Sequence, residues 1–124
     1  MEPNPPGLRP ATLCIHAGYR ASAEQRAVVA PIVNSTTFLL DDEAYAAMTS
    51  GRSADAWIYT RIRNPTLDVV QTRIAALEGA DRCLVFASGM AAVHASILSV
   101  TKSGSRIVAH REIYGTTWDL LANL

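Results

Sequence analysis

Lysine is nearly absent from this sequence: ten of the eleven basic residues are arginine, and Lys102 is the only lysine. Eleven acidic residues balance them, so the formal net charge is zero and no strong field exists to gather nucleic acid or an anionic membrane. Long apolar runs are also missing, since none approaches the roughly 18 residues that a membrane helix needs. A nucleic-acid-binding or membrane-spanning protein is therefore not expected.

Cysteine and histidine are too few and too scattered for a disulfide framework or a metal centre. Cys14 and Cys83 lie far apart, and the three histidines show no ligand spacing. Cys83 stands in an apolar run, where a buried small hydrophobe is expected. Residues 1–10 are rich in proline and lack the apolar stretch of a secretory signal, so we expect a cytoplasmic location and no metal.

The first 50 residues are expected to form an N-terminal arm and one short helix that contact another subunit. Four prolines within residues 1–10 favour polyproline or turn geometry, and Pro31 argues against a central strand, so residues 1–36 are expected to be extended. Such an arm must bury its apolar residues against the same chain or against another one. Asp41 and Asp42 predict a helix that Gly51 ends, followed by a loop over residues 51–63.

Asn64 and Pro65 predict a helix over residues 65–78. Asparagine is a good N-cap residue and proline fits the first helical position. Apolar residues follow at helical spacing, Asp68 in the first turn suits the helix dipole, and Gly79 is placed to end the helix.

Residues 83–109 are expected to form a parallel strand–helix–strand unit. The continuous apolar run 83–87 is typical of a strand buried on both faces, residues 90–100 follow as a helix, and residues 106–109 form a second apolar run. Thr116 is expected to cap a last helix. The pattern predicts an α/β fold with an incomplete parallel sheet, because two strands do not make a stable parallel sheet.

Three places are candidates for binding chemistry. Ser88-Gly89-Met90 lies where a helix begins, and free backbone N–H groups there favour an anion, although an ordinary tight turn is the alternative. Tyr114 follows the second strand, where its ring could stack on a planar ligand or simply pack in a loop. Tyr59 and Arg61 would face the same way in an extended segment and could hold a phosphate, unless Arg61 pairs with a carboxylate.

Five motifs, in order, resemble those of the Cys/Met-metabolism enzymes that depend on pyridoxal phosphate, which include cystathionine γ-synthase and γ-lyase, methionine γ-lyase and homoserine-ester sulfhydrylases. They are TLCIHAG (12–18), PIVNSTTF (31–38), YTRIRNPT (59–66), LEGA with FASGMAA (77–80 and 86–92), and IYGTT (113–117). The resemblance covers nearly the whole chain and implies the start of a fold-type I large domain over residues 51–124.

The resemblance also implies roles for particular residues. The cofactor phosphate would be held at the start of a helix by Ser88, Gly89 and Met90. Tyr114 would stack on the pyridine ring and act in proton transfer at the substrate amine. Tyr59 and Arg61 would reach the phosphate of a neighbouring subunit in a homo-oligomer, whose substrate would be a sulfur amino acid or a homoserine ester.

Some positions depart from the family pattern. Thr116 stands where methionine γ-lyases have cysteine, and Ile62-Arg63 replaces smaller residues, for which the sequence offers no reason. Pyridoxal chemistry needs a lysine, yet Lys102 is expected at the far end of its helix from Ser88. The chain is therefore expected to be an inactive N-terminal segment of such an enzyme, with a phosphate-binding module or a subunit docking on a longer relative as alternatives.

Overall fold

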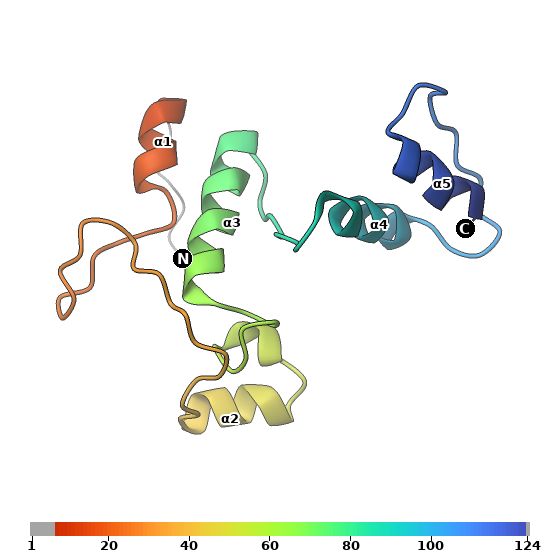
Figure 1. Cartoon of the computed structure of the whole chain (residues 1–124). Coiled ribbons are helices and arrows are strands. Elements are labelled where there is room, and N and C mark those ends of the chain that lie inside the picture. The colour runs from red at the N-terminus through yellow and green to blue at the C-terminus, as the bar shows by residue number, and fades with distance from the viewer. Residues whose placement is uncertain (1–6, 124) are drawn as a thin grey trace. The chain divides into compact units, whose positions relative to one another are not determined.

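Residues 7–123 are described by the computed structural model, and in this range helices alternate with irregular segments (Figure 1). In chain order the elements are α1 Pro10–His16, α2 Asp42–Thr49, the short 3-10 turn η1 Ser53–Asp55, α3 Pro65–Glu78, α4 Gly89–Val100 and α5 Gly115–Asn123. The chain divides into two compact units after Leu84. None of the helices in the described range has the length and apolar character needed to cross a membrane.

α3 has the bounds that the sequence predicts. The Asn64 side chain caps it by accepting a hydrogen bond from the Thr66 backbone N–H at 2.8 Å, and Pro65 opens the first turn. Gly79 ends the helix with φ of 63°, in the left-handed conformation that glycine adopts readily. Asn64 is also 5% exposed, and its amide donates to the Val33 carbonyl and the Thr60 hydroxyl, each at 3.0 Å. The cap therefore fastens two earlier segments to α3.

α1 corrects the expectation that residues 1–36 are extended. Pro10 opens this helix, where its missing N–H costs nothing. At the other end, the Arg73 side chain of α3 donates to the carbonyls of Ile15 and Ala17, both at 2.9 Å. Carbonyls at the end of a helix have no N–H donor within the helix, so a donor on α3 stabilises a helix that the local sequence does not predict. α1 and α3 lie side by side (Figure 1).

The short helix expected after Asp41 is confirmed as α2. The Asp41 carboxylate caps it by accepting from the Ala44 backbone N–H at 2.8 Å. The helix ends at Thr49, and Gly51 follows with φ of 74°. The expected loop over residues 51–63 is irregular apart from η1. The prolines at positions 3, 5 and 6 lie outside the described residues.

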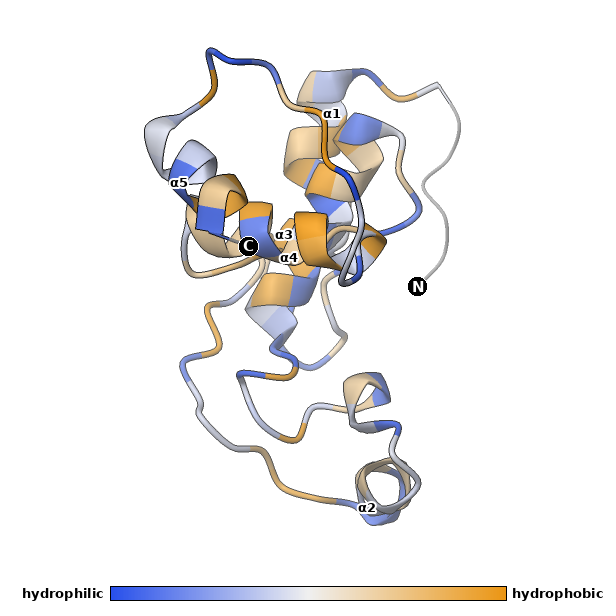
Figure 2. Cartoon of the chain, turned by 90° about the vertical axis from the view of Figure 1, so that its right-hand side faces the viewer, coloured by the Kyte–Doolittle hydropathy of each residue, from blue (hydrophilic) through white to orange (hydrophobic). Residues whose placement is uncertain are grey.

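The two strands expected around α4 are not found. Between residues 7 and 123 the only strand-like pairing is an isolated antiparallel bridge between Thr37 and Tyr59. A strand is defined by its ladder of backbone pairing, and within residues 7–123 no such ladder is formed by the runs 83–87 and 106–109. Their apolar side chains are accordingly open to solvent, with Leu84 73% and Val108 99% exposed. Apolar stretches lie on several loops outside the helices (Figure 2).

The helices of this second part are confirmed, with corrections in detail. α4 begins at Gly89, one residue before the expected range 90–100, and Ser88 is its N-cap. Thr116 lies inside α5 rather than capping it, because Tyr114 supplies the first carbonyl of that helix. Cys83 is half-buried rather than buried as its apolar surroundings predict, and Val100 at the end of α4 is 82% exposed. The expected domain division at residue 50 stays a prediction.

Candidate phosphate-binding site

The start of α4 presents free hydrogen-bond donors. The Ser88 hydroxyl oxygen accepts from the Ala91 backbone N–H at 3.1 Å, and the Ser88 carbonyl accepts from Ala92 at 3.2 Å. The N–H groups of Gly89 and Met90 have no hydrogen-bond partner within residues 7–123. A helix start with two free N–H groups attracts an anion through both hydrogen bonding and the helix dipole.

Space around Gly89 is open. A Cβ atom built on Gly89 would meet nothing within 4 Å, and Ser88 and Gly89 are exposed. An anion could therefore approach the backbone of this turn closely. Ser88 keeps its own hydroxyl proton for donation, since its capping bond uses only the oxygen as acceptor.

Tyr114 stands directly before α5 in the same unit. Its carbonyl accepts from the N–H groups of Thr117 and Trp118 at 2.9 and 3.0 Å, which closes the first turn of α5. The Thr117 hydroxyl lies 3.7 Å from the Met90 sulfur. The first turns of α4 and α5 are thus neighbours, and the Tyr114 ring, 70% exposed, is available for stacking near them.

Tyr59 and Arg61 come together by a turn, not by the extended segment that the sequence suggests. The Tyr59 carbonyl accepts from the N–H groups of Ile62 and Arg63 at 2.9 and 3.1 Å. The guanidinium carbon of Arg61 lies 5.1 Å from the centre of the Tyr59 ring, within the range of a cation–π contact. Arg61 is exposed and forms no ion pair or hydrogen bond with the residues that the structure describes. Its guanidinium is therefore available to an anionic ligand.

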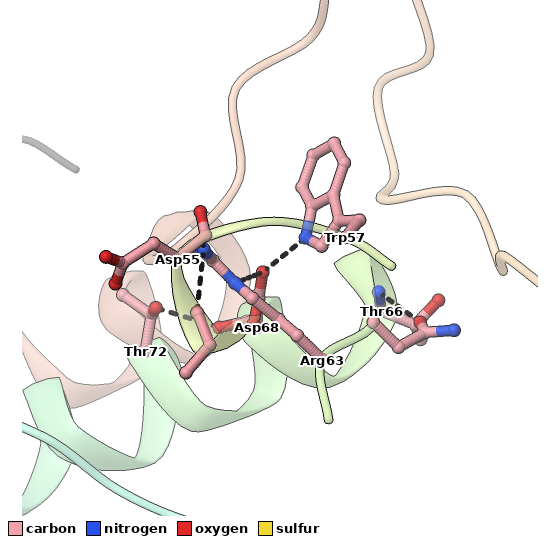
Figure 3. A network of polar contacts seen from close by, with 8 residues as sticks. Asp55, Trp57, Arg63, Thr66, Asp68 and Thr72 are labelled. Carbon is pink, nitrogen blue, oxygen red and sulfur yellow. Dashed lines mark hydrogen bonds and ion pairs between the residues drawn. The ribbon is translucent and has the colours of Figure 1, made fainter. Parts of the chain in front are cut away.

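The carboxylate pairing considered for Arg61 is made by Arg63 instead. Its Nε donates to Asp68 Oδ2 at 2.9 Å, and its Nη1 donates to the carbonyl of Asp55 at 3.0 Å. The Trp57 indole N–H donates to the same Asp68 oxygen at 2.9 Å (Figure 3). Sequence reasoning missed this network. The available signal was a guanidinium five residues before a carboxylate in the first turn of a helix.

Lys102 lies two residues beyond the end of α4. Its backbone is held in a turn with Ser105 by two hydrogen bonds of 2.9 and 3.0 Å. Since α4 has twelve residues, about 18 Å of helix separate this end from Ser88. Lys102 lines an open cavity of about 550 Å³ with Leu98 and Trp118, at the opposite end of α4 from the free N–H groups. Within residues 7–123, no cluster of His, Cys, Asp or Glu suited to a metal ion is found.

Comparison with known proteins agrees with the order of these motifs. The chain is 35% identical over 120 residues to an O-acetyl-L-homoserine sulfhydrylase of Leptospira meyeri, which covers 97% of this chain and 27% of the relative. It is 36% identical over 110 residues to an L-methionine gamma-lyase of Pseudomonas deceptionensis, with 89% and 28% covered. A homocysteine/cysteine synthase of Kluyveromyces lactis is 38% identical over 111 residues, with 87% and 24% covered.

The chain thus spans about a quarter of the length of these relatives. A family model described as Cys/Met metabolism PLP-dependent enzyme matches residues 11–124. That match includes every candidate site residue described above. The chain belongs to the Cys/Met metabolism family of pyridoxal-phosphate-dependent enzymes.

Proposed function

We propose that this chain supplies the phosphate-binding elements of a pyridoxal phosphate site in an enzyme acting on sulfur amino acids or homoserine esters, by β- or γ-elimination or by γ-replacement. The observation that carries the proposal is the pair of free N–H groups of Gly89 and Met90 at the start of α4. When bound, the cofactor supplies the electron sink for a carbanion next to the substrate amine. The chemistry of the relatives, as their names state it, supports this substrate class.

The side chains around this helix start fit a phosphate and an aromatic ring. Ser88 can donate its hydroxyl proton to a phosphate oxygen, beside the two backbone donors. Tyr114, exposed at the neighbouring first turn of α5, would stack on the ring and hold or move a proton at the substrate amine. Tyr59 and Arg61 add a phenol and a bidentate guanidinium, which suit phosphate oxygens.

We propose further that Tyr59 and Arg61 reach the phosphate bound by α4 of a second copy. The exposed apolar residues of the arm support a neighbouring subunit, since Val28 is 93% and Ile32 is 85% exposed. The same exposure favours the second candidate, a subunit that docks on a longer relative. The runs 83–87 and 106–109 would become strands of a fold-type I sheet once further strands pair with them. Their exposed apolar side chains support this proposal, because such side chains are suited to burial in a parallel sheet.

Binding of pyridoxine 5′-phosphate, compared with pyridoxine, tests the phosphate site. Neither compound has an aldehyde, so neither can react with Lys102. Calorimetry should give a Kd ratio of at least about tenfold in favour of the phosphate, as expected for about 1.5–3 kcal/mol of charged hydrogen bonding. Gly89→Pro should remove this preference, because proline fits the first helical position but lacks the N–H.

Gly89→Ala is the matched control, because it keeps the N–H and its Cβ enters open space. Arg61→Met should also reduce the phosphate preference. Equal Kd values for the two compounds on the unmodified chain, or a preference that survives both Gly89→Pro and Arg61→Met, would overturn the proposed site.

A further inference from the structure

Arg63 closes the loop that carries Tyr59 and Arg61. On one side of the loop its Nη1 donates to the Asp55 carbonyl at 3.0 Å, at the end of η1. On the other side its Nε binds Asp68 at 2.9 Å in the first turn of α3. One side chain therefore joins the two ends of residues 56–62, and this stretch is seven residues long.

The Asp68 carboxylate, which accepts this hydrogen bond, is largely buried and accepts from a second donor as well. The Asp68 side chain is 12% exposed and the Arg63 side chain 31%. Trp57, inside the loop, donates its indole N–H to the same carboxylate oxygen, and the Arg63 guanidinium carbon lies 6.0 Å from the centre of the Trp57 ring (Figure 3). Charged hydrogen bonds in such a partly buried network hold geometry better than exposed ion pairs do.

We propose that Arg63 and Asp68 are positioning residues, which hold the loop so that Tyr59 and Arg61 present one fixed arrangement to a phosphate. The inference rests on the proposed phosphate-binding function and adds residues that touch no ligand. The backbone N–H of Arg63 also donates to the Tyr59 carbonyl at 3.1 Å, so a displacement of the Arg63 backbone moves the backbone of the tyrosine directly. Preorganised binding groups gain affinity because less ordering remains to be done on binding.

Charge alone makes a different prediction, which allows a clean test. Removal of the Asp68 carboxylate takes away a negative charge and would strengthen phosphate binding by simple electrostatics. The positioning role predicts the opposite, since Arg63 and Trp57 then lose their common acceptor. Asp68→Ala and Arg63→Met should therefore weaken phosphate binding alike, although they change the net charge in opposite directions.

The experiment measures the Kd of pyridoxine 5′-phosphate and of pyridoxine by calorimetry on the full chain, with far-UV circular dichroism at the same temperature. Arg63→Met and Asp68→Ala should each lower the ratio of the two affinities about tenfold, as expected when a charged hydrogen bond is lost. The double variant should lose no more than either single variant, because both remove one contact. Arg63→Lys should lie between, and Arg82→Met, an exposed arginine of the same unit, should match the unmodified chain.

The outcomes separate this inference from the proposed function. A phosphate preference that depends on Arg61 but survives Arg63→Met, or that rises in Asp68→Ala, overturns the positioning role alone. A missing preference in the unmodified chain overturns the proposed function first. If Arg63→Met loses its helical signal, Trp57→Phe replaces it, since this change deletes one donor to Asp68 and should still lower the ratio about threefold.

Discussion

Gly18 lies just after α1, where the backbone approaches α3 closely. A methyl group added at this position should push the segment after α1 away from α3. The residue has φ of 75°, and a Cβ built on it would lie 2.8 Å from the Thr72 Cβ and 2.9 Å from the Val69 carbonyl oxygen. The Val69 oxygen is a backbone atom of α3 and the Thr72 Cβ is bonded directly to the backbone, so neither atom can move away by a side-chain rotation. Gly18→Ala can be accommodated only if the segment after α1 moves off α3.

The expected cost has two parts that a control separates. The left-handed backbone costs roughly 1–2 kcal/mol for a residue with a Cβ, and overpacking adds roughly 1–3 kcal/mol, so Gly18→Ala should lower the free energy of unfolding by about 2–5 kcal/mol. Gly51 has nearly the same φ, 74°, but nothing lies within 4 Å of its added Cβ. Gly51→Ala should therefore cost only the backbone part, and urea unfolding followed by circular dichroism measures both.

Hydrogen exchange adds a local measure of the same change. Exchange in residues 13–17 should accelerate in Gly18→Ala, because the Arg73 bonds to Ile15 and Ala17 require α1 to stay on α3. Equal unfolding free energies for the Gly18 and Gly51 variants, with unchanged exchange in α1, would refute the close approach.

Three further changes test other parts of the structure. Asn64→Ala should lower the free energy of unfolding by about 2–3 kcal/mol in urea, because it removes a helix cap and two part-buried hydrogen bonds of the side-chain amide; Asn64→Asp keeps the cap and should cost less. Arg73→Met should raise hydrogen exchange in α1 while exchange in α4 stays unchanged, and equal acceleration in both helices would contradict the docking contact. The chain with pyridoxal phosphate and cystathionine should release no keto acid above the free cofactor, whereas turnover that Lys102→Ala abolishes would contradict the assignment of Lys102 to the far end of α4.

The helices that carry their own end signals could be predicted from sequence. α3 has Asn64 and Pro65 at its start and Gly79 at its end, so local chemistry determines both bounds. The start of α4 was predicted to within one residue, and it places the candidate phosphate donors. α1 was missed because its stability depends on Arg73, 56 and 58 residues away from the carbonyls that it binds.

The strands illustrate the opposite case. An apolar run such as 83–87 indicates that its side chains are suited to burial, but a strand also needs a paired neighbour, and residues 7–123 contain no strand beside this run. The candidate site likewise has a part that the sequence predicts and a part that only the structure shows. Sequence motifs pointed to Tyr59 and Arg61 as a pair, but the turn that joins them and the Arg63–Asp68 contact beneath it depend on three-dimensional packing.

Mixing two defective variants tests most directly whether Arg61 of one copy serves the helix start of another. Arg61→Met and Gly89→Pro each remove one half of the proposed phosphate site, so each variant alone should show a weaker preference for pyridoxine 5′-phosphate over pyridoxine than the unmodified chain. If copies pair symmetrically and exchange freely, a 1:1 mixture should regain tight sites at about a quarter of the unmodified stoichiometry, because half of the pairs are mixed and each holds one intact site. A mixture that regains no tight binding, while the unmodified chain shows it, would contradict a site shared between two copies.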